Sequence, residues 1–270
     1  MNTAVKPAGG ADGQALIDTH AHLSDEAYDG DRKEVIARAR AAGVAQIVNV
    51  GFDLDSSRKA AALAREYDFI YAAAGVHPHD AARAPAGYLA ELEALARGRK
   101  VVAVGETGLD FYRNLSPRPE QRRVFREQLA LARELELPVI IHDRDAHEEV
   151  LKILRQDGLG PAGGVLHCFS GDWEMARECL RMGFYISFAG VVTYPKSTQL
   201  QRIAVDLPPE RLLIETDCPY LTPAPLRGKR NEPALVRRVL EQIAGLRGMP
   251  AAELAQLTTE NARRLFRLPE

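Results

Sequence analysis

The sequence predicts an α/β protein built as a TIM (β/α)8 barrel in a single domain. Short β-rich runs alternate with longer amphipathic stretches along nearly the whole chain, and eight such runs can be distinguished. Polar residues recur where these runs should end, and the first and last of them, His20 and Asp217, are 197 residues apart. Seven intervals of about 28 residues suit a parallel strand followed by its crossover helix.

The competing architecture for such an alternation is a doubly wound open sheet. That sheet should carry a nucleotide-binding fingerprint after its first strand, and neither G-x-G-x-x-G nor G-x-x-x-x-G-K follows the first run here. No shift to linker-like composition interrupts the alternation, so residues 15–270 are expected to form one domain. Residues 1–14 are rich in Gly and Ala and lack the apolar core of a signal peptide, so we expect a disordered lead-in there.

Each predicted strand is a short run of aliphatic, β-branched or aromatic residues. The strands are ALID (15–18), QIVNV (46–50), FIYAAAGV (69–76), VVAVG (101–105), PVIIH (138–142), GVLHC (164–168), FYISF (184–188) and LLIET (212–216). The helical patterns, with apolar residues three and four apart, include 31–43, 55–68, 119–136, 172–183, 232–248 and 251–268. Helix boundaries are indicated by Asp31 and Asp55 as N-caps and by Gly43, Gly158 and Gly183 just past helix ends.

The composition restricts the classes of function that the protein could have. Lys plus Arg total 35 against 37 Asp plus Glu, so no overall positive field indicates nucleic acid or an anionic membrane, and a polyanion would need a local basic patch. No apolar run reaches the length of about 18 residues that a membrane span needs. The three cysteines, Cys168, Cys179 and Cys218, form no C-x-x-C pair, which favours reduced thiols and a cytoplasmic protein.

The stretch LIDTHAHL, residues 16–23, places two histidines one residue apart. Because side chains alternate along a strand, His20 and His22 should point the same way with their rings roughly 6 to 7 Å apart, a separation that one metal ion can bridge. An isolated H-x-H is equally compatible with ordinary hydrogen-bonded histidines. The residues at the other strand ends are therefore needed to distinguish the two interpretations.

In a barrel of this kind the carboxyl ends of the strands converge on one face, where the active site lies. The imidazoles and carboxylates at the predicted strand ends are His20, His22, Glu106, His142, His167 and Asp217. We expect the first two histidines and Asp217 to bind one metal ion, the other two histidines to bind a second, and Glu106 to bridge both. Such a two-metal site can lower the pKa of a bound water and neutralise charge on a phosphate oxygen.

These segments resemble the TatD family of metal-dependent deoxyribonucleases. The resemblance is carried by LIDTHAHL, GVHPHD, VGETGLDFYR, IIHDRDAHEEVL, LHCFSG and IETDCPYLTP followed by RGKRNEP, and it runs from about Leu16 to the C-terminus. It implies a TIM-barrel hydrolase that cleaves phosphodiester bonds in DNA and has the same six residues as metal ligands.

The resemblance also shapes what we expect of catalysis and substrate. We expect two divalent ions (Zn²⁺, Mn²⁺ or Mg²⁺), DNA as a single strand or at its ends, and no obligate protein partner. Asp217 and Glu106 are expected to be catalytic residues as well as ligands, and Asp217 is expected to orient and deprotonate the attacking water.

Several residues near the strand ends are candidates for binding substrate or supporting the ligands. The candidates for contacting substrate are His77, Arg113, Arg144, Arg227, Lys229 and Arg230. The five cations would form a local basic patch for phosphates, and a solvated run of surface charge is the alternative for the last three. Asp110 either orients a ligand histidine or caps a turn, whereas His79 is expected to hold a loop and His147 to be solvated.

Two other functions remain open from the residues alone. The same barrel could hydrolyse an amide or a lactone, but many such enzymes bridge their ions with a modified lysine at the end of the fourth strand. This chain has Glu106 there, and Lys100 lies at the opposite end of VVAVG. The third possibility is a metal-binding protein without catalysis, and the intact ligand set argues against it.

Overall fold

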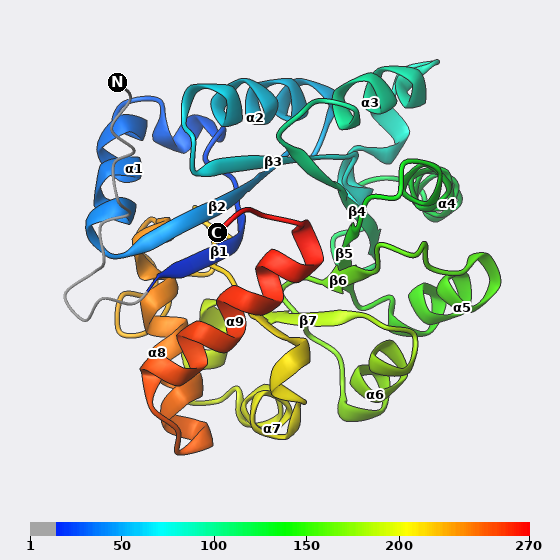
Figure 1. Cartoon of the computed structure of the whole chain (residues 1–270). Coiled ribbons are helices and arrows are strands. Elements are labelled where there is room, and N and C mark those ends of the chain that lie inside the picture. The colour runs from blue at the N-terminus through cyan, green and yellow to red at the C-terminus, as the bar shows by residue number, and fades with distance from the viewer. Residues whose placement is uncertain (1–14) are drawn as a thin grey trace.

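The computed structural model describes residues 15–270 as eight parallel strands surrounded by helices (Figure 1). The strands, each paired with the next, are β1 (Leu16–Ala21), β2 (Val44–Val50), β3 (Ile70–Ala74), β4 (Val101–Asp110), β5 (Val139–Arg144), β6 (Gly164–Leu166), β7 (Tyr185–Phe188) and β8 (Leu212–Ile214). The helices are α1 (Arg32–Ala41), α2 (Leu54–Glu66), α3 (Tyr88–Ala96), α4 (Arg118–Glu134), α5 (His147–Asp157), α6 (Trp173–Arg181), α7 (Thr198–Asp206), α8 (Val236–Arg247) and α9 (Ala251–Phe266). The predicted TIM barrel is confirmed, whereas the predicted lead-in, residues 1–14, lies outside the described residues.

The barrel closes between its first strand and the segment after its last. Ala21 forms a parallel bridge with Cys218. The backbone N–H of His22 donates to the carbonyl of Cys218 at 2.8 Å, and the N–H of Asp217 donates to the carbonyl of His20 at 2.9 Å. These bonds bring the two histidines and Asp217 together although they come from opposite ends of the barrel sequence.

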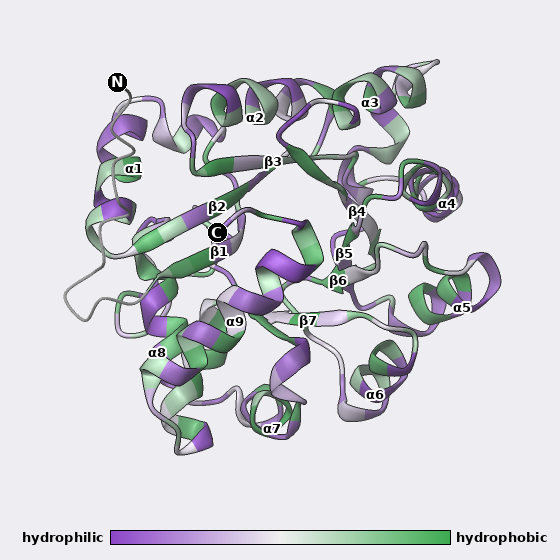
Figure 2. Cartoon of the chain, viewed as in Figure 1, coloured by the Kyte–Doolittle hydropathy of each residue, from purple (hydrophilic) through white to green (hydrophobic). Residues whose placement is uncertain are grey.

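Two buried apolar layers hold the barrel together. The outer layer packs strand side chains such as Ile47 and Val104 against the surrounding helices. The inner layer fills the barrel with side chains such as Val48 and Ile140, and Leu265 and Phe266 of α9 belong to it. Figure 2 shows the apolar strands at the centre and helices whose outer sides are mostly hydrophilic.

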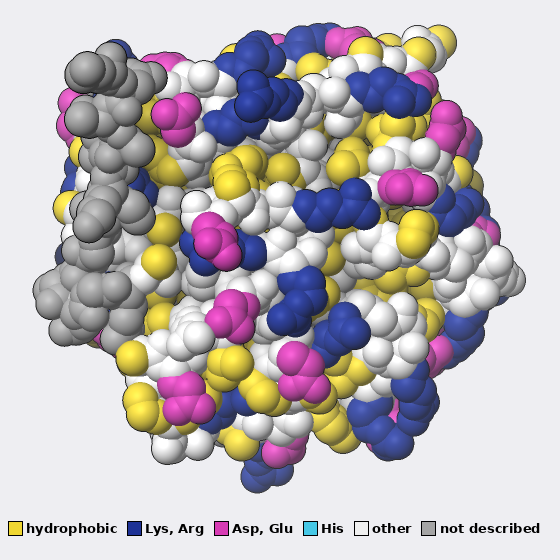
Figure 3. Space-filling view, in the orientation of Figure 1, with side chains coloured by type: hydrophobic (Ala, Val, Ile, Leu, Met, Phe, Trp, Pro, Cys, Tyr) yellow, Lys and Arg dark blue, Asp and Glu magenta, His cyan; other side chains and the backbone are white. Residues whose placement is uncertain are grey.

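Helix α9 lies across the amino ends of the strands. The side-chain amide of Asn261 donates to the carbonyl of Leu212 at the start of β8, and the hydroxyl of Thr259 donates to the carbonyl of Ala15 beside β1. Figure 3 shows this face of the described chain with basic and acidic side chains interspersed and no histidine among them. The end of the barrel that carries the histidines is therefore the opposite one. Among residues 15–270 no helix is long and apolar enough to span a membrane.

The sequence placed the end of the fourth strand too early. β4 continues to Asp110, so Glu106 lies within the strand instead of at its end. The reason is an irregularity in the ladder to β5: pairing is interrupted after Val104 and resumes at Thr107, so that the strand is extended by a second stretch of paired residues.

The predicted helix boundaries are mostly confirmed. Asp31 is the N-cap of α1, and the three predicted glycines, Gly43, Gly158 and Gly183, have positive φ angles just past helix ends. The expectation for Asp55 is wrong, because α2 begins after Asp53. The Asp53 carboxylate accepts a hydrogen bond from the Ser56 N–H at 2.7 Å in a reciprocal capping box, which Asp55 does not form.

Candidate active site

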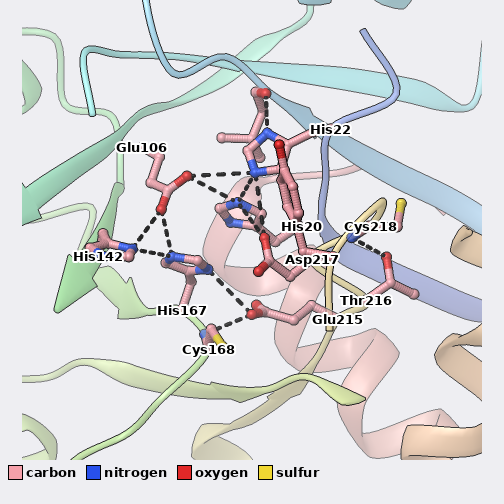
Figure 4. Close-up of polar contacts among 12 residues, drawn as sticks. His20, His22, Glu106, His142, His167, Cys168, Glu215, Thr216, Asp217 and Cys218 are labelled. Carbon is pink, nitrogen blue, oxygen red and sulfur yellow. Dashed lines mark hydrogen bonds and ion pairs between the residues drawn. The ribbon is translucent and has the colours of Figure 1, made fainter. Parts of the chain in front are cut away.

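The six residues predicted to bind metal lie together at the carboxyl end of the barrel (Figure 4). They come from five different parts of the sequence: His20 and His22 from β1 and its end, Glu106 from β4, His142 from β5, His167 from the end of β6 and Asp217 from the segment after β8. All six side chains are buried or nearly so. No lysine or arginine forms an ion pair with either carboxylate among the described residues.

The first group consists of the two histidines of the H-x-H and Asp217. The Nε2 atoms of His20 and His22 are 3.2 Å apart, and their ring centroids are 4.9 Å apart, closer than a regular strand would place them. An Oδ1 atom of Asp217 lies 3.4 Å from Nε2 of His22 and 3.8 Å from Nε2 of His20. Three ligand atoms therefore converge on one point.

Glu106 connects this group to the other two histidines. Its Oε2 lies 3.4 Å from Nε2 of His20 and 3.6 Å from Nε2 of His22. Its Oε1 lies 2.7 Å from Nε2 of His167 and 2.9 Å from Nδ1 of His142. One oxygen faces each group, which is the arrangement that a bridging carboxylate requires.

Hydrogen bonds around the cluster turn ring nitrogens with free lone pairs toward its centre. Nδ1 of His22 donates to the carbonyl of Val50 at 2.9 Å, so its Nε2 is unprotonated in the neutral ring. Nε2 of His142 lies 3.3 Å from Oδ2 of Asp110, which leaves Nδ1 facing Glu106. Such outer carboxylates fix the orientation of a ligating imidazole.

Asp110 both orients a histidine and holds a turn. Besides His142, its Oδ2 contacts Nε2 of His79 at 2.9 Å, and its Oδ1 accepts a hydrogen bond from the N–H of Arg113 at 2.7 Å. Both interpretations left open by the sequence therefore apply to the same side chain. His147 begins α5 with a side chain that is 35% exposed, and it also contacts Asp143 at 2.9 Å.

Glu215 is a member of the site that the sequence did not single out. Its Oε1 lies 3.3 Å from Nδ1 of His167 and accepts a hydrogen bond from the N–H of Cys168 at 2.6 Å. Glu215 therefore lies beside the outer ring nitrogen of His167, in the same way that Asp110 lies beside the outer ring nitrogen of His142. The available signal was a charged residue inside the apolar run LLIET, directly after β8.

His77 turns its Nε2 atom toward Glu106. Its Nδ1 accepts a hydrogen bond from the N–H of His79 at 3.1 Å, so the neutral ring carries its proton on Nε2, which lies 3.4 Å from Oε1 of Glu106. Burial lowers the pKa of His77 well below its usual value, so the ring is neutral at pH 7. Nε2 of His77 therefore faces Glu106, and His77, Glu106 and His142 together also have the spacing of a candidate metal-binding group.

The electrostatics of the cluster keep both carboxylates ionised. Burial opposes ionisation of Glu106, but His167 and His77 in their protonated forms, with hydrogen bonds from protonated His142 and His167, hold its pKa well below the usual range. Burial also opposes ionisation of Asp217, and the hydrogen bond with His22 and nearby histidines lower its pKa overall. Two anions among histidines, with no other cation paired to them, fit divalent metal ions.

A cavity of about 950 Å³ opens over the cluster at the carboxyl end of the barrel. Its wall includes three of the predicted substrate residues, His77, Arg113 and Arg144, and two cations the sequence did not single out, Arg83 and Lys196. The Arg144 guanidinium lies over the ring of Tyr112, 4.1 Å from its centroid. Arg83 pairs with Asp80, whereas Arg113, Arg144 and Lys196 form no ion pair within residues 15–270.

The three cations after β8 do not belong to the wall of the cavity. Arg227, Lys229 and Arg230 are exposed, and none of them lines the cavity. Arg230 is held on the outside by Asp31 of the α1 N-cap at 2.6 Å, and Arg227 lies over the ring of Tyr194. The single basic patch expected from the sequence is therefore divided, and only its Arg113 and Arg144 border the cavity.

Asp18 is a buried carboxyl two residues before His20. Thr216 donates to it twice, from its hydroxyl at 2.6 Å and from its N–H at 2.9 Å, which joins β1 to the segment after β8. Burial raises the pKa of Asp18 to about 8 despite these hydrogen bonds. Its carboxyl group is therefore mostly protonated at neutral pH.

The raised pKa of Asp18 predicts a pH-dependent stability. Between about pH 4 and about pH 8 the folded chain holds a proton here that the unfolded chain has lost, so the free energy of unfolding falls as pH rises, by up to about 1.4 kcal/mol per pH unit. Asp18→Asn has no such proton. The unfolding free energy of the variant minus that of the wild type, from urea denaturation in chelator, should increase from about pH 5 to about pH 8; parallel curves would contradict the assignment.

Comparison with known proteins gives one consistent family. The model of the family described as TatD related DNase matches residues 17–267. The uncharacterized metal-dependent hydrolase YabD of Bacillus subtilis is 53% identical, over 94% of this chain and 99% of that protein. The 3'-5' ssDNA/RNA exonuclease TatD of Cronobacter sakazakii is 44% identical, over 93% of this chain and 97% of that protein.

The fold comparison agrees with the sequence comparison. The crystal structure of YJJV, a TatD homologue from Escherichia coli, superposes with a TM-score of 0.88 at 35% identity and covers 94% of this chain and 98% of that one. The family match spans every strand that carries a cluster residue. The chain belongs to the TatD related DNase family and is a metal-dependent hydrolase that acts on ester bonds.

Proposed function

We propose that the protein is a deoxyribonuclease that removes nucleotides from single-stranded DNA or from DNA ends with the help of two divalent metal ions. The observation that carries this proposal is Glu106, whose two carboxylate oxygens each face a separate group of histidines. Names of relatives support the substrate, since TatD of Cronobacter sakazakii is a 3'-5' ssDNA/RNA exonuclease. RNA is a second candidate substrate on the same grounds.

Each group of histidines would bind one of the two ions. His20, His22 and Asp217 would hold one ion, and His142 and His167 the other, with Glu106 shared. Divalent ions at these positions supply a more acidic water and neutralise charge on phosphate oxygens. Imidazole-rich groups favour Zn²⁺ or Mn²⁺, and the carboxylates also accept Mg²⁺.

The chain's own groups would perform the remaining steps. Asp217 lines the cavity and is ionised, so it can accept a hydrogen bond from the attacking water and take its proton. Arg113, Arg144 and Lys196, on the cavity wall, can bind the phosphates on either side of the scissile bond. Asp110 keeps His142 in place by hydrogen bonding, and His77 lies against Glu106.

Hydrolysis of an amide or lactone is the second candidate. The position of Lys100 counts against the bridging lysine of many such enzymes, because its Nζ donates to the carbonyls of Tyr67 and Asp68 at the amino end of the barrel, away from the cluster. A panel of nucleic acid, amide and lactone substrates tested with one metal-loaded sample would separate the two activities.

The three cysteines are free thiols, which supports a cytoplasmic location.

The division of the cations predicts which of them contact DNA. Arg113→Gln combined with Arg144→Gln should raise KM. It should also reduce the slope of log KM against log salt concentration by the amount expected for roughly two lost phosphate contacts, because fewer counterions are released on binding. Arg227→Gln with Lys229→Gln should have a smaller effect, since these side chains lie outside the cavity. Equal changes in both double variants would show that the outer cations bind the substrate as well.

A further inference from the structure

A second hollow adjoins the active-site cavity. Its volume is about 390 Å³, and it is lined by Trp173, Thr198, Gln199, Arg202, Ile203 and Asp206. Thr198 and Gln199 also line the cavity over the histidine cluster. The first turn of α7 is therefore a wall that the two hollows share.

Trp173 supplies an aromatic surface in this second hollow. It is the first residue of α6, and the preceding Asp172 caps that helix by accepting from the N–H of Met175 at 2.9 Å. The indole is partly buried and packs against the main apolar core on one side while it lines the hollow. An aromatic ring fixed in this way loses little conformational entropy when a flat ligand stacks on it.

The polar residues of the hollow complement a nucleic acid strand. Arg202 is exposed and forms no ion pair with any carboxylate in residues 15–270, whereas Arg177 on the outer side of α6 pairs with Glu174 at 3.0 Å. Lys196, at the edge of the first cavity, is likewise without an ion pair in that range. The carboxylate of Asp206 can accept hydrogen bonds from the amino groups of a base.

We infer that this hollow is a distal subsite for single-stranded nucleic acid, in which a base stacks on Trp173 and a phosphate contacts Arg202. The strand would run from the histidine cluster over Thr198 and Gln199 to α6. The inference rests on the proposed nuclease function and extends it, because it makes long single strands better substrates than short ones. A duplex keeps its bases stacked inside and cannot use the indole.

The test uses the intrinsic fluorescence of Trp173, the only tryptophan in the chain. Metal-loaded protein is titrated with phosphorothioate oligothymidylates, which resist cleavage: a dinucleotide, which the first cavity can hold, and an oligomer of about twelve nucleotides. Quenching by the oligomer and not by the dinucleotide is expected. No change with either ligand, or an equal change with both, overturns a separate distal subsite.

Kinetics of variants give a second reading of the same subsite. Trp173→Leu and Arg202→Gln should each lower the ratio of kcat/KM for the oligomer to kcat/KM for the dinucleotide, for Trp173 by about 5- to 150-fold, the usual worth of one stacked base. Trp173→Phe keeps an aromatic ring and should retain most of the ratio. Arg177→Gln removes one charge outside the hollow and serves as the matched control for Arg202.

The outcomes separate this inference from the proposed function. If the wild type cleaves both lengths and every variant keeps the wild-type ratio, the distal subsite is overturned while the nuclease function stands. If the wild type cleaves no nucleic acid, the proposed function fails, and the fluorescence titration still decides whether a strand binds at Trp173.

Discussion

Asp217→Asn should reduce kcat by about 10² to 10⁴, the usual contribution of a positioned general base, while the protein stays folded. The substitution preserves the shape of the side chain and one coordinating oxygen, but it removes the negative charge and most of the basicity. Of the two carboxylates in the cluster, Asp217 is the more accessible to a water in the cavity, since its side chain is 13% exposed and that of Glu106 only 4%.

The measurement is kcat on single-stranded DNA at saturating metal, together with the thermal unfolding midpoint. Metal affinity should weaken moderately, so a metal titration is needed to reach saturation. If the Asp217 side chain only stabilises the segment after β8, the variant will lose some stability and keep its turnover. An asparagine variant with wild-type kcat would therefore remove Asp217 from catalysis.

His20→Ala and His142→Ala should each abolish most of the activity and should change the metal content in different ways. His20 faces Asp217 and Oε2 of Glu106, whereas His142 faces His167 and Oε1 of Glu106. Each variant should therefore lose mainly the ion of its own group. Elemental analysis after gel filtration, with Zn²⁺ or Mn²⁺ as the loaded metal, gives the stoichiometry for each variant.

His147→Ala is the matched control for this pair. It also removes a partly buried histidine with a carboxylate partner, Asp143, but its ring lies outside the cluster. It should keep the wild-type metal content and most of the turnover. Wild-type turnover of His20→Ala or His142→Ala at every metal concentration would show that the residue is no ligand, and an identical metal loss in both would contradict two separate groups.

The sequence predicts the barrel and the cluster because both depend on local patterns combined with one topological rule. Strand and helix periodicities identify the eight units, and parallel strands must bring their carboxyl ends together. Side chains as distant as His20 and Asp217 are therefore predicted to meet without any knowledge of contacts. The closure between Ala21 and Cys218 is what makes that prediction correct.

Features that depend on the exact path of the backbone were not predictable in this way. The interrupted ladder between β4 and β5 decides that Glu106 lies inside its strand, and no periodicity signals such an irregularity. The roles of Asp18 and Glu215 depend on hydrogen bonds from other segments, two from Thr216 to Asp18 and one from Cys168 to Glu215. Arg230 is drawn away from the cavity by Asp31, a partner nearly the whole length of the barrel earlier in the sequence.

A titration with metal is the most direct test of metal-dependent cleavage of single-stranded DNA. Protein stripped with chelator should release no nucleotides from a single-stranded oligomer. Activity should return as Mn²⁺, Zn²⁺ or Mg²⁺ is added back and reach its maximum near two bound ions per chain, counted by elemental analysis in the same samples. Undiminished cleavage by the stripped protein, or no cleavage of any nucleic acid by the fully loaded protein, would contradict the account.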